Sequence, residues 1–414
     1  MKRHPARQPA VSLLLLLLLV ATLLHAADQP PIFSEIATME AGLADITGLR
    51  FKHPVPYGVL TKDQLRIFLD QRIKKAIKPA DMRAEELTLQ MLGLIPSDFD
   101  LRQNTVDLLT EQAAAFYDYN KKKLFILAGS GSGIEDRTAL VHELAHALAD
   151  QHFHLGKYIR EGELSDDGST ARLAVMEGQA TWLMAAYLAK QDGGVAEVPD
   201  RMLDLMTESI QSSAREYPVF SKAPLYIRES LVFPYSSGML FQNAVFRKLG
   251  RASFSEVFTN PPASTQQILH PDLYLAHHAP NNPPAPRMPD PHSFRTLAEG
   301  NLGEFDYRVL LSEYSSDEVG KDAATHLSGS SYALLEHKHD KFPVLVYAST
   351  WDSPESARKY FELYSKVLRG KWKTVEFDSE TPSQLAGHGD PGYFRTWLDR
   401  STVNHIEGWK SSLH

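Results

Sequence analysis

Cysteine is absent from this chain of 414 residues. Its absence excludes disulfides, thiolate nucleophiles, iron–sulfur clusters and zinc sites built on cysteine. Any metal that the chain binds must therefore be held by nitrogen and oxygen. Histidine, aspartate and glutamate are the donors that remain, and the sequence holds 17 histidines.

A surplus of positive charge is also lacking. The chain has 43 Lys and Arg against 51 Asp and Glu, which gives a formal net charge of −8. Because a phosphate-binding face normally shows as an excess of Lys and Arg, no nucleic acid partner is expected. The apolar share of 43% and the charged share of 23% are ordinary for globular proteins. The length fits one large or two to three ordinary domains.

Long apolar runs are lacking except near the N-terminus. Three basic residues precede the run Val11–Leu24, and the small residues Ala26 and Ala27 follow it. This pattern is typical of a secretory signal peptide, because the run is shorter than the roughly 20 residues that a spanning helix needs. Residues 1–26 are therefore predicted to be a signal peptide. We expect a periplasmic or secreted protein without stable membrane insertion after cleavage, and an uncleaved anchor helix is the alternative.

Prolines mark the clearest boundary along the chain. Residues 277–292 hold six prolines and are predicted to form an extended linker, because this density excludes regular helix and central strand. Residues 27–276 show helical patterns with few strands. Residues 293–414 show strand patterns at 331–336 and 342–347 and a helix pattern at 353–368. The predicted fold class is α+β: a mainly helical domain with a small sheet, then a smaller α+β C-terminal domain.

One motif carries the chemistry, in a helix predicted over 137–153. His142 and His146 are four residues apart and share a helix face, so two imidazoles can bind one Zn²⁺ with Glu143 beside them. Zinc lowers the pKa of a bound water to about 7, and Glu143 can take its proton as the general base of peptide hydrolysis. A chance HExxH is the alternative, and it should arise in roughly one chain in 25 of this length.

Catalytic zinc usually has three protein ligands, and two residues compete for the third place. His152 stands six residues after His146, as in HExxHxxGxxH sites. Ala149 replaces the glycine of that pattern, however, so the helix continues and turns His152 about 240° away from His146. The better candidate is Glu177, on a second helix predicted over 168–191.

A helical hairpin would bring Glu177 to the zinc. If residues 154–167 form the turn, His146 and Glu177 both lie roughly 12–14 Å from it along antiparallel helices. Gly178 and Ala180 would let the helices approach closely. The same arithmetic places Asp150 opposite Arg172, and these two residues are predicted to pair beside the metal ligands.

The chain resembles a known family of zinc peptidases. A HExxH helix followed by a helix with a ligand Glu is the gluzincin arrangement. The wider chain looks like a group of poorly characterised bacterial secreted gluzincin-like proteins, through the segments Phe116-Tyr117-Asp118, His142–Phe153, Glu177–Thr181, Phe233-Pro234-Tyr235 and Pro262–Pro271. The resemblance implies a zincin-like fold with one Zn²⁺ per chain on His142, His146 and Glu177, and Glu143 as the base. It implies no substrate.

Two supporting roles stay open. Thermolysin-type gluzincins carry an Asp shortly after the ligand Glu to orient a zinc-binding His, but Ala180-Thr181 stand at that place here. Asp150 or Asp167 could take the role. A second group must stabilise the oxyanion. His270 and Tyr235 are the candidates for it, although a loop His and a core Tyr are the simpler interpretations.

Upstream of the motif, Leu124–Leu127 reads as a short strand. In zincins an edge strand above the metal pairs with extended peptide, so this strand is a candidate for substrate binding. An ordinary sheet strand is the alternative. The preceding Lys121-Lys122-Lys123 reads as a solvated turn.

The sequence therefore predicts an exported zinc metalloendopeptidase that acts on a protein or peptide. The alternative is a catalytically silent or latent zincin-fold protein that binds peptides or envelope partners. The intact Glu143 favours the enzyme, since a silent site has no need of the base. Substrate, oligomeric state and the role of residues 293–414 are not predicted.

Overall fold

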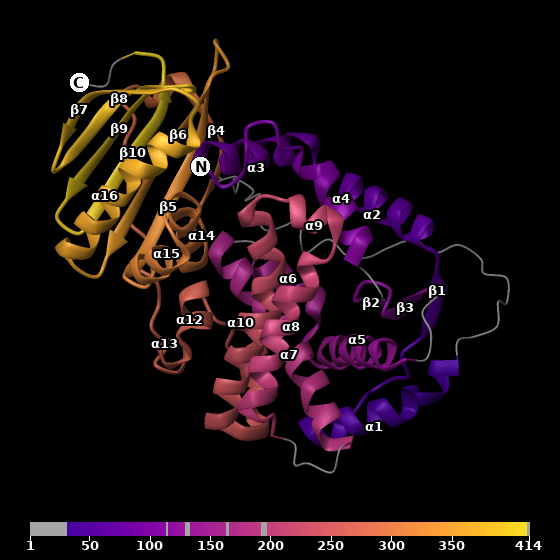
Figure 1. The fold of residues 1–414 in the computed structure, drawn as a ribbon. Coiled ribbons are helices and arrows are strands. Elements are labelled where there is room, and N and C mark those ends of the chain that lie inside the picture. Colours follow the sequence, from indigo (N-terminus) through magenta and orange to yellow (C-terminus); the bar gives the residue numbers. More distant parts are fainter. Residues whose placement is uncertain (1–30, 113–114, 129–132, 163–164, 192–196, 412–414) are drawn as a thin grey trace.

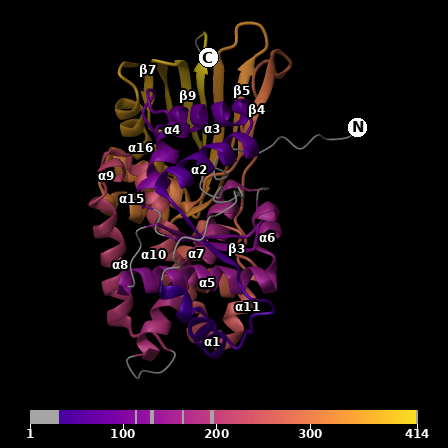
Figure 2. The same ribbon diagram turned by 90° about the vertical axis from the view of Figure 1, so that its right-hand side faces the viewer.

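The computed structural model describes residues 31–112, 115–128, 133–162, 165–191 and 197–411. These residues form a mainly helical region with a small sheet, followed by a unit built on a larger sheet (Figures 1 and 2). The predicted α+β class is confirmed. The predicted signal peptide at 1–26 lies outside the described residues. Within the described part of the chain, no helix combines the length and apolarity needed to cross a bilayer.

The helical region contains three short strands among its helices. Thr61 caps α2 in a capping box with Gln64. The two long predicted helices are present as α5 and α7, each a few residues longer at its start. The elements are α1 (Ile36–Thr47), β1 (Tyr57–Leu60), α2 (Lys62–Ala76), α3 (Pro79–Leu92), α4 (Leu101–Gln112), β2 (Ala115–Asp118), β3 (Lys123–Leu127), α5 (Ile134–Phe153), α6 (Leu155–Gly162), α7 (Asp166–Gln191), α8 (Asp200–Arg215), α9 (Pro218–Lys222), α10 (Leu225–Leu249), α11 (Ser253–Thr259), α12 (Thr265–Leu269) and α13 (Pro271–Leu275).

Helix α7 is the central element of this region. It is buried along most of its length, as expected for a helix that is surrounded by others. It crosses α10 where two glycines meet: a Cβ on Gly178 would lie 2.0 Å from the carbonyl carbon of Gly238. Only glycine permits this backbone approach. Because Gly178 follows Glu177 directly, the crossing fixes the position of that carboxylate.

Replacing Gly178 with Ala is expected to lower the free energy of unfolding by about 3 kcal/mol or more, because the added methyl forces two backbones apart. Urea denaturation measures the loss. Gly133→Ala is the matched control, because the nearest atom to a Cβ there is 3.7 Å away. Equal stability of the two variants would show that α7 and α10 can separate without cost.

The C-terminal unit is a seven-stranded antiparallel sheet with the strand order β4-β5-β6-β10-β9-β8-β7. Residues 277–290 before it contain neither helix nor strand. The predicted strand at 331–336 lies within β5, the predicted strand at 342–347 overlaps β6, and the predicted helix at 353–368 corresponds to α16, which Ser353 caps. The elements are β4 (Phe294–Gly300), α14 (Glu304–Tyr314), α15 (Asp317–Ala324), β5 (Leu327–His337), β6 (Pro343–Trp351), α16 (Pro354–Lys371), β7 (Val375–Thr381), β8 (Gln384–Gly389), β9 (Gly392–Asp399) and β10 (Thr402–Trp409).

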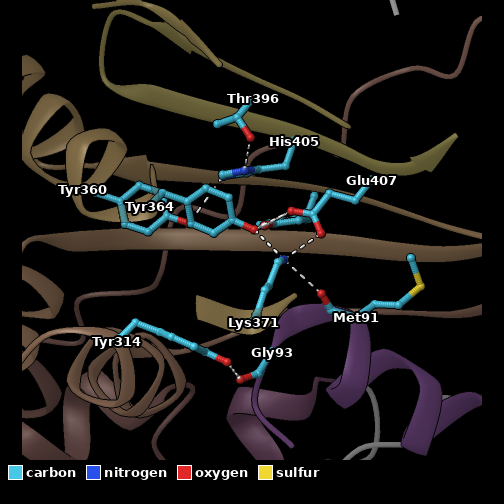
Figure 3. Close-up of polar contacts among 10 residues, drawn as sticks. Met91, Gly93, Tyr314, Tyr360, Tyr364, Lys371, Thr396, His405 and Glu407 are labelled. Atoms are coloured by element: carbon cyan, nitrogen blue, oxygen red, sulfur yellow. Dashed lines mark hydrogen bonds and ion pairs between the residues drawn. The ribbon is translucent and has the colours of Figure 1, made fainter. Parts of the chain in front are cut away.

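The C-terminal unit holds the end of α3 (Figure 3). The ammonium of Lys371 donates to the carbonyl of Met91 at 3.0 Å and pairs with Glu407 at 2.6 Å, and the hydroxyl of Tyr314 donates to the carbonyl of Gly93 at 2.7 Å. Carbonyls at a helix C-terminus lack donors within the helix, so these contacts satisfy them. One hydrophobic cluster also runs through α3, α7, α10 and the C-terminal sheet.

Three buried aspartates line the junction of the two parts. Asp166 at the start of α7 accepts a hydrogen bond from Tyr332 of β5 at 2.7 Å, and Asp306 of α14 accepts one from Tyr226 of α10 at 3.0 Å. Asp167 accepts two from the backbone and hydroxyl of Thr265. Burial raises the pKa of Asp166 and Asp167 to about 7 and that of Asp306 to about 6.

Stability is therefore expected to fall as the pH rises from about 5 to 8. These carboxyls bind protons more tightly in the folded chain than in the unfolded chain, whose aspartates titrate near pH 4. Their contribution is complete below about pH 4 and is lost as the pH passes their folded pKa values near 6 to 7. Urea denaturation with chelator present should show a loss of about 2–4 kcal/mol.

The variant Asp166→Asn should flatten part of this pH dependence, because an amide does not titrate. Asp204→Asn, at an exposed position of α8, is the control and should leave the slope unchanged. Stability that rises between pH 5 and 8 in the native protein would contradict the assignment.

Candidate metal centre

Helices α5 and α7 bring three ligand atoms together. The Nε2 atom of His142 lies 3.1 Å from Nε2 of His146, and Oε2 of Glu177 lies 3.1 and 3.2 Å from these two nitrogens. The three side chains are 12, 10 and 11% exposed. Among the described residues, this is the one group of three or more His, Asp or Glu side chains whose ligand atoms all lie within 4.8 Å of one another. The group could hold a metal ion.

The donors of this cluster suit a cation better than they suit each other. Two imidazole nitrogens cannot both donate to one carboxylate oxygen and also share a hydrogen bond, because each neutral ring carries a single N–H. A cation between the three atoms would satisfy all of them at once. The pKa of Glu177 reflects the same attraction: burial opposes its ionisation, but His146 and His142 hold its pKa well below the usual range.

The predicted antiparallel hairpin is wrong, although Glu177 does meet His146. Figure 1 shows α5 lying across α7 instead of alongside it, and the two helices are in contact. The chain turns sharply at His154, which has a φ of 56°, and residues predicted to form the turn fold into α6. Helices α5 and α7 therefore lie close to each other only near the point where they cross.

The predicted pair of Asp150 and Arg172 is also wrong. Arg172 donates to the carbonyl of Tyr158 in α6 at 2.8 Å and lies over its ring. Asp150 binds Lys122, whose ammonium lies 2.6 Å from its carboxylate. The cause is α6, which occupies the space next to Arg172.

The general base predicted from the motif lies beside the ligands. The Oε2 atom of Glu143 accepts a hydrogen bond from the backbone N–H of Tyr117 in β2 at 2.7 Å. Burial raises the pKa of Glu143 to about 8, even though His142 and the N–H of Tyr117 both favour the ionised form. The N–H of Tyr117, at the edge of the small sheet, thus holds the Glu143 carboxyl close enough to His142 and Glu177 for both to affect its pKa.

Of the two oxyanion candidates, the structure brings only Tyr235 to the cluster. Its ring stacks on the imidazole of His142, with ring centres 5.9 Å apart. Burial and the charges of Glu177 and Glu143 hold the pKa of Tyr235 well above its usual value, so its hydroxyl remains a donor. His270 lies elsewhere. Its Nε2 is 2.9 Å from Glu304 of α14, because its loop packs on the C-terminal unit.

Neither aspartate suggested to orient a zinc-binding histidine does so. Asp150 binds Lys122 and Tyr117. Asp167 lies at the start of α7, away from Glu177, and binds Thr265 of α12. His152 is not a ligand either, because it contacts the carbonyl of Arg50. Its place agrees with the rotation expected for an unbroken helix.

The strand predicted to pair with substrate is present as β3, but it is not an edge strand. The order of the small sheet is β1-β3-β2, with β1 parallel and β2 antiparallel to β3. Both edges of β3 are therefore already paired, and β2 is the strand next to α5. The alternative, an ordinary sheet strand, is therefore confirmed, and the neighbouring strands β1 and β2 were not recognised in the sequence.

Sequence reasoning missed two residues near the site. Lys122 was interpreted as part of a solvated turn, but it pairs with the buried Asp150. Tyr117 entered only through the resemblance, although it contacts both Glu143 and Asp150. The local sequence gives no signal for these contacts, because they join residues 26–33 positions apart along the chain.

Comparisons with known proteins identify no family for this chain. No family model matches the chain, and no curated protein matches it. A solved structure from Chloroflexus aurantiacus, described as a "putative hydrolase with a novel fold", is similar with a TM-score of 0.36 and 15% identity, over 61% of this chain and 92% of that chain. A TM-score below 0.5 does not establish a shared fold.

Proposed function

We propose that this protein is a zinc-dependent metalloendopeptidase of the gluzincin kind, exported from the cell, with protein or peptide as substrate. The observation that carries the proposal is the convergence of His142, His146 and Glu177 beside Glu143. Export rests on the composition of residues 1–26. The gluzincin kinship rests on the motif and on the ligand Glu of a following helix.

The donor set fits zinc. For bonds of about 2.0–2.2 Å in a tetrahedral site, ligand atoms lie roughly 3.3–3.6 Å apart, and the three atoms here are 3.1–3.2 Å apart. Two imidazoles and one carboxylate are a known ligand set of catalytic zinc, which keeps a further position open. When bound, zinc supplies Lewis acidity that activates water and polarises a carbonyl.

The chain's own residues supply the remaining chemistry. Glu143 takes a proton from the attacking water and later gives it to the leaving amine. The backbone N–H of Tyr117 orients that carboxyl through its Oε2 atom. Tyr235, protonated and packed on His142, can donate its hydroxyl to a developing oxyanion.

Metal removal tests the proposal. The purified protein should contain one zinc per chain and cleave an unfolded protein substrate. A chelator should abolish cleavage, and one equivalent of Zn²⁺ should restore it. A protein that binds no zinc would refute the metal site. Stoichiometric zinc without cleavage of any unfolded substrate would favour the catalytically silent peptide-binding protein instead.

A further inference from the structure

Tyr117 contacts α5 at two points that lie two helical turns apart. Its backbone N–H donates to Glu143 at 2.7 Å, and its hydroxyl donates to Oδ2 of Asp150 at 2.8 Å. Seven residues separate the two carboxylates, so they lie on one face of the helix about 10 Å apart. One tyrosine therefore spans the distance from the general base to a buried acid.

The edge of the small sheet makes the first contact possible. Strand β2 pairs with β3 on one side only, and alternate backbone groups of an edge strand point away from its partner. The N–H of Tyr117 is such a group. It is bound to Glu143 and is therefore not free to pair with an extended peptide.

Asp150 is fixed by partners on several sides. It is 1% exposed and accepts hydrogen bonds from Lys122 at 2.6 Å and from the backbone of Leu155 at 2.9 Å, besides that of Tyr117. Lys122 has a φ of 55°, a left-handed conformation within the turn between β2 and β3. Charge-assisted bonds of this kind are short and strong, and a buried network of them is rigid.

We propose that Tyr117, Asp150 and Lys122 are positioning residues that hold the carboxyl of Glu143 in its working orientation. Lys122 and Asp150 fix the phenol of Tyr117, and the fixed residue presents its N–H to Glu143. The kinetic part of this inference rests on the proposed function. The structural part, the fixing of the N–H of Tyr117, does not.

Loss of the contacts that fix the phenol of Tyr117 should slow turnover without weakening substrate binding. Tyr117→Phe removes the hydroxyl and keeps both ring and backbone N–H, and Lys122→Met removes the charge that holds Asp150. Each should lower kcat about 10-fold or more, with KM within about twofold and zinc content unchanged. Lys122→Arg should restore most of kcat, because it keeps the charge.

The matched control is Lys123→Met, in the same hairpin but without a contact to Asp150. Hydrogen exchange of the backbone amide of residue 117 supplies a second measurement that needs no activity. Exchange should be at least about 10-fold faster in Lys122→Met than in Lys123→Met, because Tyr117 is then no longer held in the position that keeps its N–H bonded to Glu143.

The two measurements separate the possible failures. A zinc-loaded protein that cleaves nothing would refute the proposed function, while the exchange rate would still decide whether Tyr117 is anchored. Equal exchange rates in Lys122→Met and Lys123→Met would overturn the positioning role. An equal kcat in these two variants would overturn it as well. Should Tyr117→Phe fail to fold, Lys122→Met decides, because the Lys122 side chain is 55% exposed.

Discussion

Glu143→Gln is expected to lower the turnover of an unfolded protein substrate by about 10²–10⁴-fold, the usual contribution of a general base. A carboxamide cannot take a proton from water, but its oxygen can still accept the N–H of Tyr117, so the side chain should stay in place. Zinc content and thermal stability should not change. Steady-state kinetics, metal analysis and thermal unfolding measure turnover, zinc content and thermal stability, respectively.

Glu208→Gln provides the control, because Glu208 is an exposed residue of α8 that tests the same change of charge away from the site. It should keep full turnover. If Glu143→Gln kept more than about a tenth of the native turnover with zinc bound, another group must act as the base, and the proposed mechanism would be wrong.

Glu177→Gln is expected to weaken zinc binding by at least about 100-fold. Changes to the residues behind metal ligands typically cost 10–100-fold in affinity, and this change removes the one anionic ligand. A neutral amide oxygen cannot compensate the charge of the ion as a carboxylate does. Competition with a zinc-binding dye measures the dissociation constant. The rise in melting temperature caused by saturating zinc should shrink in parallel.

The two variants control each other. Glu143→Gln should lose turnover and keep zinc, whereas Glu177→Gln should lose both. A Glu177→Gln protein with native zinc affinity and turnover would exclude Glu177 as a ligand. The gluzincin assignment would then fail, although His142 and His146 could still bind a metal with some other third group.

The part of the site that the sequence predicted follows from local geometry. His142 and His146 converge because residues four apart on a helix share a face, and this holds wherever the helix lies. Glu177 was predicted by measuring equal lengths along two helices. The predicted meeting of Glu177 and His146 is present although the predicted hairpin is wrong. Two crossing helices also come together at one point, and these two side chains lie at that point.

The remaining contacts depend on how distant segments pack, which a single sequence does not specify. Arg172 misses Asp150 because α6 fills the predicted turn. Lys122 reaches Asp150 through a left-handed backbone angle that no local preference of lysine indicates. His270 faces Glu304 because α12 packs against the C-terminal unit. Composition and periodicity predicted the two architectures of the fold, but not the junction between them.

The hydrophobic cluster shared by α3, α7, α10 and the C-terminal sheet bears on cooperativity. Where one core serves two architectures, neither part can open without exposing apolar surface of the other. Local unfolding of the sheet would then remove packing contacts from α7, the helix that carries Glu177. A cavity introduced into the sheet, far from the candidate metal centre, would thus disturb the positions of His142, His146 and Glu177 by shifting the folding equilibrium, without any direct contact between the two places.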